Sequence, residues 1–524
     1  MTLLELLRDG YFPKELPPPF STVSFATQVT THLTSMPATI MSGNFPSGRP
    51  TAITASHHVT RVGKLQRLLG IPNPLTHLRL CNEIANNWTA LHAFTHASPL
   101  SVSKPNSATG QTRALIPQNT WSALPEIRAA AQLGNRYLVK ADIESFYHSI
   151  YTHSLSWALH TKAFAKINRD PNHLGNRLDT LVRNGQDGQT IGIPIGPDTS
   201  LLLAEIILAA VDATLITSLG NLDGFRFVDD YEICCPTLSH AEKVLHSLES
   251  ALSSFELSLN PYKTKIHSIP IELHANWATE LRHFEIRAAP RAQRNNLIEY
   301  FSRAIELSVL NPDKSVLRFC IARFRNISID STNVPLLQTL LLHCVSCEQG
   351  TIPFVLEILV RLHLNGCNVP TVHLQKVFNS HIQYHAPLGH TSEVAWSIWG
   401  AITFNVMLDS TTANLISTVD DSIVALLSLD ADSRNLFSSP LDKTLWIQDM
   451  TQQELYEGHW LLSYEANVKG WLTSTSGIDH VSIDPNFSFL KTNGVQFYDL
   501  SQAGPVVPKA TEPFPGPTGD VSPI

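Results

Sequence analysis

The sequence predicts an α+β unit in the first part of the chain and an all-helical region in the second. Short apolar segments of strand type alternate with helical segments up to about residue 285, whereas apolar residues recur at helical spacing beyond residue 290. Residues 1–290 carry 23 basic and 23 acidic side chains, and the rest of the 524-residue chain carries 14 and 22. The composition, with 43% hydrophobic and 16% charged residues, is typical of a globular protein. The net charge of −8 argues against a protein that coats nucleic acid through bulk positive charge.

Residues 1–60 are expected to form an extended arm, because the run YFPKELPPPF at 11–20 holds prolines that cannot donate backbone hydrogen bonds. The first ten residues lack the apolar core of a signal peptide, and no apolar run of 18 residues indicates a membrane span. Seven scattered cysteines favour a reducing compartment. We therefore expect a cytoplasmic protein that does not engage a membrane.

A Ser, Asn and Gly-rich loop at 98–113 follows, within a region of helical patterns that spans 61–135. Its positive charges are Lys104 and Arg113. Contact with a nucleotide phosphate and ordinary solvated loop charge are the two interpretations of this pair.

The α+β pattern is most regular between residues 137 and 266. The elements expected there are a strand at 137–143, a helix at 145–158, a glycine-punctuated loop at 188–196, a helix at 200–215, a strand–turn–strand hairpin at 224–233, a helix at 239–256 and a final segment at 257–266.

Three carboxylates carry the predicted chemistry of this region. Asp142 ends the first strand, and the adjacent Asp229 and Asp230 occupy the hairpin turn. Unpaired carboxylates at buried strand ends are costly, and Mg²⁺ offsets that cost because it prefers carboxylate and phosphate oxygens. Two such ions, about 3.5–4 Å apart, are typical of in-line phosphoryl transfer. An acidic surface turn is the alternative interpretation of an isolated Asp-Asp pair.

The order of these motifs resembles the palm of reverse transcriptases. The segment DIESFY at 142–147 matches their motif A, GIPIG at 192–196 matches motif B, FVDD at 227–230 is a variant of motif C, and LNPYKT at 259–264 is similar to motif D. The resemblance spans roughly residues 60–285 and implies the fingers and palm of a right-hand polymerase at 61–285.

The resemblance also implies roles for the acids and for the residues beside them. Asp142 and Asp229 would be the principal ligands of two Mg²⁺ ions, with Asp230 in support, the Ile143 carbonyl on one ion and Mn²⁺ as the alternative metal. Lys263 would protonate the pyrophosphate leaving group.

Other residues are expected to contact the nucleotide. Tyr147 matches the steric gate that clashes with a ribose 2′-OH, which implies deoxynucleotides as substrates. Gly192 and Gly196 would let the backbone approach the incoming base and the template, with Pro194 and Ile195 in the same loop. Most family members have Gln where this chain has Ile195, and an apolar side chain cannot make the polar contacts of that Gln.

A second resemblance spans nearly the whole chain. The variant IPIGPDTS at 193–200, the N-terminal arm and the segment 460–471 are similar to bacterial defence-associated and abortive-infection reverse transcriptases. In that group α-helical repeats replace the thumb, and the members protect bacteria against phage. We therefore expect a HEAT-like helical domain at 286–500, with an irregular bundle as the alternative, and a Pro-rich disordered tail at 501–524.

The function that this resemblance implies is Mg²⁺-dependent DNA synthesis from dNTPs in antiphage defence, by an RNA-directed DNA polymerase in the bacterial cytoplasm. The template would be a noncoding RNA, or the DNA would be primed on a protein hydroxyl and stay covalently attached. A template-independent nucleotidyl transferase, a catalytically idle scaffold that binds RNA or protein, and a helical adaptor are the alternatives. The acidic helical region is expected to form a homo-oligomer contact.

Overall fold

The computed structural model describes residues 1–508 apart from 44, 46–47, 49, 62–64, 109–112 and 274. The chain divides into two compact units whose segments alternate along the sequence. The first unit comprises Met1–Tyr11, Val29–Thr54 and Ile71–Leu273, and the second comprises Phe12–Gln28, Ala55–Gly70 and His274–Ile524. The predicted tail lies outside the described residues from position 509 onward.

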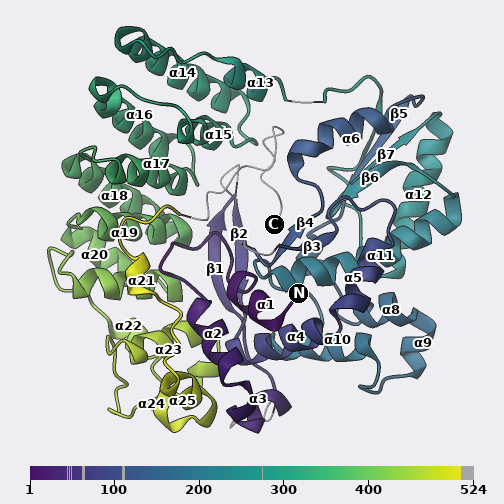
Figure 1. Ribbon diagram of the computed structural model, residues 1–524, viewed down its shortest axis with the longest axis horizontal. Helices are drawn as coiled ribbons and strands as arrows, with labels where there is room; N and C mark the ends of the chain where they lie inside the picture. Colours follow the sequence, from purple (N-terminus) through teal and green to yellow (C-terminus); the bar gives the residue numbers. More distant parts are fainter. Residues whose placement is uncertain are drawn as a thin grey trace. The chain divides into compact units, whose positions relative to one another are not determined.

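A four-stranded antiparallel sheet forms the centre of the first unit, with strand order β6-β7-β5-β8. Its strands are β5 (Tyr137–Asp142), β6 (Asp223–Phe227), β7 (Asp230–Cys235) and β8 (Lys265–Ser268). Val139 and Ala141 are fully buried, and Lys140 between them is exposed. Because side chains alternate across a strand, Lys140 shares its face of β5 with the buried Leu138 and Asp142. Helix α12 (Leu238–Ser254) packs on β5 and β7, as Figure 1 shows. The predicted hairpin and the strand that ends at Asp142 are confirmed.

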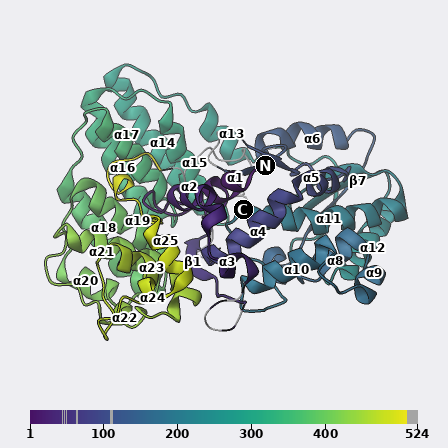
Figure 2. The same ribbon diagram turned by 60° about the horizontal axis from the view of Figure 1, so that its bottom comes forward.

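Helix α11 (Asp198–Leu219) is the central helix of this unit, because it is apolar on all sides and buried along most of its length. It is long and apolar enough to cross a membrane by length and composition alone, but 78% of its most apolar window is buried. Figure 2 shows α8 (Ser154–His160), α10 (Leu174–Asn184) and α11 side by side. The other elements that lie within this unit are α1 (Leu3–Asp9), η1 (Leu33–Ser35), α3 (Ala38–Ser42), α4 (Pro74–Asn86), α5 (Trp88–His96), β3 (Pro105–Ser107), β4 (Leu115–Pro117), η3 (Trp121–Ala123), α6 (Leu124–Ala131), α7 (Phe146–Ser149) and α9 (Lys162–Ile167).

The helix predicted at 145–158 is interrupted. Helix α7 ends at Ser149, and α8 begins only at Ser154. Between them, Tyr151 forms a bridge with Ile191, and the Thr152 amide donates to the Thr190 carbonyl over 2.8 Å. The pairing of this segment with the glycine loop replaces helical hydrogen bonds, which local periodicity could not indicate.

The N-terminal arm differs from its expected extended form. It contains α1, α3 and α2 (Val23–Thr31), and the chain is irregular across the Pro-rich stretch between α1 and α2. Helix α1 begins with a capping box between Thr2 and Glu5. The two side chains accept hydrogen bonds from backbone N–H groups that have no acceptor within the helix.

The second unit is largely helical, as predicted. Within it each helix contacts the next but one, α14 with α16 and α16 with α18, and likewise α15 with α17 and α17 with α19 (Figure 1). The HEAT-like repeat stays a prediction. The elements of the second unit are β1 (Ala55–Thr60), α13 (Asn276–His283), α14 (Pro290–Leu310), α15 (Val316–Ala322), η4 (Arg323–Arg325), η5 (Ser331–Asn333), α16 (Val334–Cys347), α17 (Ile352–Leu364), α18 (Thr371–His385), η6 (Ala386–Leu388), α19 (Thr391–Phe404), α20 (Ser410–Ile416), α21 (Ser422–Ser433), α22 (Thr444–Ile447), η7 (Glu454–Tyr456), α23 (Trp460–Val468), α24 (His480–Ile483), α25 (Pro485–Thr492) and η8 (Leu500–Gln502). Strand β2 (Gln66–Ile71) pairs with β1.

Candidate active site

The three predicted aspartates meet where β5 and β7 pair. Asp142 is the last residue of β5 and lies directly opposite Asp230, the first residue of β7, in the antiparallel register. Asp229 precedes Asp230 in the turn, and Asp142 and Asp229 are only 8% and 7% exposed. Burial, then the charges of Asp229 and Asp142, raise the pKa of Asp230 to about 8. The fold therefore concentrates negative charge at one sheet end.

These residues fit a divalent cation. Like charges directly opposite on neighbouring strands are destabilising, and a cation between them removes that repulsion. The donors are carboxylate oxygens together with the backbone carbonyl of Ile143, which follows Asp142, and such oxygens are the ligands that Mg²⁺ and Mn²⁺ prefer.

Lys263 reaches the same acids from the turn before β8. The Asn260 amide donates to the Asp142 carbonyl over 2.8 Å, which anchors that turn to the end of β5. The Lys263 Nζ lies 2.8 Å from Asp142 Oδ2, and the Lys263 side chain is 58% exposed. The structure thus brings the predicted lysine to the predicted acids and leaves its ammonium accessible.

The turn that carries Asp229 is held in an uncommon backbone conformation. Val228 has a φ of +51°, in the left-handed region that a β-branched residue rarely adopts. Its amide donates to Ser103 Oγ over 2.7 Å, and its carbonyl accepts from Arg226 Nη1 over 2.9 Å. Two side chains from outside the turn therefore fix the residue beside the aspartate pair.

Arg226 is also the centre of a buried ionic network that the sequence analysis missed. Its fully buried guanidinium lies 2.9 Å from Glu205 and 2.8 Å from Asp212. The two acids are seven residues apart on α11 and so lie on one face of that helix. Two acids at this spacing in an otherwise apolar helix, and an arginine within an apolar strand, are the signals that could have indicated it. Further donors to the two acids are Ser98, Ser101, Ser103 and Tyr231.

The glycine loop runs along the segment after β5. The Gly192 amide donates to Ile150, and the Ile193 amide donates to the Tyr147 carbonyl, each over 2.8 Å. Gly192 has a φ of +87°, and a Cβ there would lie 3.3 Å from the His148 carbonyl oxygen. The loop thus requires glycine at this position.

Two further residues predicted to contact the nucleotide are largely enclosed by the protein. Tyr147 is 6% exposed and lies beside Phe146, and Ile195 in the glycine loop is 7% exposed. Gly196, with a φ of +130°, ends this loop next to Pro197.

Arg113 is engaged within the protein. Its guanidinium pairs with Asp198 at the start of α11 and donates to the Gly196 carbonyl over 2.7 Å. Asp198 also accepts from the amides of Ala114 and Leu115, each over 2.9 Å. Arg113 therefore fixes the end of the glycine loop, a role that neither of the two predicted interpretations included.

Lys104, the second predicted basic residue, directly precedes β3. Its Nζ donates to the His96 carbonyl over 3.3 Å, and burial lowers its pKa. The structure therefore places Lys104 in contact with the backbone.

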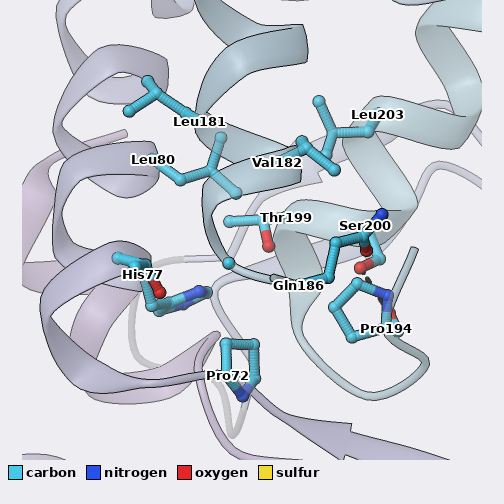
Figure 3. A pocket seen from close by; sticks show the side chains of 12 residues that line it. Pro72, His77, Leu80, Leu181, Val182, Gln186, Pro194, Thr199, Ser200 and Leu203 are labelled. Carbon is cyan, nitrogen blue, oxygen red and sulfur yellow. Dashed lines mark hydrogen bonds between the residues drawn. The ribbon is translucent and has the colours of Figure 1, made fainter. Parts of the chain in front are cut away.

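A cavity of about 20 Å³ lies beneath the glycine loop (Figure 3). Pro194 and Ser200 border it on one side, and the Ser200 hydroxyl donates to the Pro194 carbonyl. His77 borders it on the other, and burial lowers the His77 pKa to about 3, so the ring is neutral near pH 7. The other lining residues are Pro72, Thr76, Leu80, Leu181, Val182, Gly185, Gln186, Thr199 and Leu203.

A second group of potential metal ligands lies in the second unit. The ligand atoms of Asp420, Asp449 and His459 lie within 4.8 Å of one another. His459 Nε2 is 3.2 Å from Asp420 Oδ1, which forms an ion pair when the ring is protonated. The sequence analysis did not single out this group, because its members are far from any recognisable ligand spacing.

Comparison with known proteins supports the interpretation of the first unit. Residues 66–295 match the family model described as reverse transcriptase (RNA-dependent DNA polymerase). This part of the chain, less than half of its length, is similar to a reverse transcriptase domain. The matched residues include the three aspartates, the glycine loop and Lys263, and the description of that family is of a polymerase.

The other two comparisons concern curated proteins and solved structures. No curated protein matches the chain. Among solved structures, apo telomerase from Candida tropicalis is similar with a TM-score of 0.32 and 11% identity, over 65% of this chain and 69% of that chain.

Proposed function

We propose that the protein is a DNA polymerase of reverse-transcriptase type that uses Mg²⁺, or Mn²⁺ as the alternative, to join dNTPs. The main observation that supports this proposal is that Asp142 lies opposite Asp230 in the strand register, with Lys263 Nζ 2.8 Å from Asp142 Oδ2. Three clustered acids and one accessible ammonium are the groups that phosphoryl transfer needs, and a purely structural sheet end has no requirement for them.

In this proposal Asp142 and Asp229 hold the two ions, the Ile143 carbonyl contacts one of them and Asp230 supports the site. Bound there, two such ions would supply activation of the attacking oxygen and stabilisation of the leaving phosphate. The 3′-hydroxyl would lose its proton to water as its oxygen forms a bond to the α-phosphorus. The bond between the α-phosphorus and the bridging oxygen would break, and Lys263 would give its proton to the departing pyrophosphate.

Selection of deoxynucleotides is assigned to Tyr147, with the glycine loop at 192–196 shaping the nucleotide site. The Ile193–Tyr147 hydrogen bond supports this assignment, because it ties the gate residue to that loop.

The template is proposed to be a noncoding RNA. Untemplated synthesis, primed on a protein hydroxyl, is the second candidate, and Ile195 favours it. This side chain is apolar and 7% exposed, so it cannot supply the polar contact that Gln makes in most family members.

The proposed biological role is antiphage defence in the bacterial cytoplasm, with the chain acting as a homo-oligomer. The resemblance of residues 193–200 and of the helical region to defence-associated reverse transcriptases supports it. Purification as a monomer that salt does not alter would contradict the oligomer, and phage protection that survives loss of the acids would contradict a role for DNA synthesis.

The test compares the wild type with Asp229→Asn/Asp230→Asn, and uses Asp223→Asn at the far end of the same hairpin as the control. Each protein receives labelled dNTPs and Mg²⁺ with and without its co-purifying RNA, and the products are treated with RNase or protease. We expect incorporation by the wild type and the control only. Dependence on RNA identifies templated synthesis, and label that protease shifts without RNA identifies protein priming. No incorporation by the wild type would overturn the proposal.

A further inference from the structure

Two exposed lysines lie side by side on neighbouring strands of the central sheet. Lys140 on β5 and Lys265 on β8 are directly opposite in the register, and both are exposed. Lys140 precedes Asp142 by two residues, so the side chains of these two residues leave the same face of β5, about 7 Å apart along the strand. The two lysines therefore form a pair, the Lys140–Lys265 pair, next to the catalytic acids.

The charge of Lys140 acts to lower the pKa of Asp230, against the larger effects of burial and of the neighbouring aspartates. Lys140 is also opposite Glu232 on β7, but both carboxylate oxygens of Glu232 are held by Arg128, at 2.6 and 2.7 Å. No ion pair of Lys140 or Lys265 occurs in the part of the chain that the structure describes. Like charges directly opposite across strands are destabilising, so the arrangement favours an anion between them.

We propose that the Lys140–Lys265 pair binds phosphates of the nucleic-acid strand that passes the catalytic acids. The proposal rests on the proposed polymerase function. It assigns to these two lysines the contact with the backbone of the nucleic-acid strand beside the aspartates. Lysine ammonium groups on a nucleic-acid protein bind the backbone without reading sequence, which suits a surface that each added nucleotide must pass.

A strand fits this pair better than the triphosphate of a dNTP. Lys263 already provides an ammonium at Asp142, where a leaving pyrophosphate needs one. The Lys140–Lys265 pair lies further along the sheet, on two regular strands with fixed spacing. A row of cations that continues away from the acids matches a polymer with repeating phosphates.

The test measures binding without metal, so that it does not depend on catalysis. A labelled oligodeoxynucleotide annealed to RNA is titrated in EDTA with the wild type, with K140Q/K265Q and with K166Q/K243Q. The control removes two exposed lysines of the same unit, from α9 and α12, and so changes the net charge equally. Affinity is measured by fluorescence anisotropy from about 50 to 200 mM salt.

We expect K140Q/K265Q to bind about tenfold more weakly and to lower the magnitude of the slope of log affinity against log salt by about 1.5 to 2, with the control close to the wild type. Equal slopes for K140Q/K265Q and the control would overturn the proposal.

A second experiment measures KM values of K140Q/K265Q during synthesis. The KM for the oligonucleotide should rise, and the KM for dNTP should stay constant. A rise in the dNTP KM alone would assign the pair to the triphosphate instead. If the wild type binds the oligonucleotide but incorporates no nucleotide, the proposed polymerase function is wrong. The salt dependence of binding then still shows whether the Lys140–Lys265 pair contacts the nucleic-acid strand.

Discussion

At the scale of single residues, substitutions of Lys263 can distinguish two roles of its ammonium, proton donation to the leaving group and electrostatic stabilisation by its charge. Arginine keeps the positive charge but does not release a proton at working pH, whereas glutamine removes both properties. If the Lys263 ammonium protonates pyrophosphate, Lys263→Arg and Lys263→Gln should both slow nucleotide addition about 100-fold or more. Single-turnover incorporation rates, measured with saturating dNTP, check this expectation.

The matched control is Lys265→Gln, two residues away and exposed but paired with Lys140 rather than with Asp142. With saturating oligonucleotide, this variant should retain the wild-type rate of addition. If Lys263→Arg also retained that rate, Lys263 would act through its charge on Asp142 and would not donate a proton.

At the scale of elements, the β6–β7 hairpin depends on an anchor that lies outside it. Ser103 accepts from the Val228 amide over 2.7 Å and donates to Glu205 over 2.7 Å. Ser103→Ala should lower the free energy of unfolding by about 1–3 kcal/mol, because it leaves buried polar groups without their partner. It should also slow incorporation about tenfold, since the turn that carries Asp229 loses one of its two restraints.

Ser98→Ala separates these two effects. Ser98 donates to Asp212 over 2.6 Å in the same buried network, and among the described residues it has no hydrogen bond with the hairpin turn. We expect a similar loss of stability, measured by urea unfolding, with a nearly unchanged rate of incorporation. Equal losses of rate in both variants would show that the network acts through general stability rather than through the turn.

The elements of the central sheet could be predicted from the sequence because each has a local signal. The strand at 137–142 is a short apolar run that ends in an acid, and the turn at 228–229 interrupts another. The break after Ser149 and the Arg113–Asp198 pair had no such signal, because each depends on a partner more than 35 residues away. The same limit explains why the arm was expected to be extended, since its short helices have weak periodicity.

At the scale of the whole molecule, the second unit includes parts of the N-terminal region. Strand β1 packs on α19, and the buried His57 Nδ1 lies 2.8 Å from Asp421 Oδ2. The indole of Trp396 donates to the Glu15 carbonyl over 3.1 Å, and the Ser21 amide donates to the Phe497 carbonyl over 3.0 Å. A linear boundary at residue 285 therefore cuts through one compact unit, which charge and composition along the chain could not indicate.

This interleaving predicts that the helical region does not fold well alone. A fragment of residues 286–524 lacks β1 and the segment 12–28, so it exposes apolar surface and leaves Asp421 without its buried partner. We expect it to aggregate or to unfold without cooperativity, and co-expression with residues 1–285 to restore a soluble, cooperatively melting complex. His57→Ala in the co-expressed N-terminal fragment should weaken that rescue, because it removes the histidine partner of the buried Asp421 carboxylate. His246→Ala, at an exposed position on α12, should not weaken it. A monodisperse fragment 286–524 with a cooperative thermal transition would show that the helices form a domain without the N-terminal segments, and circular dichroism with light scattering distinguishes the two results.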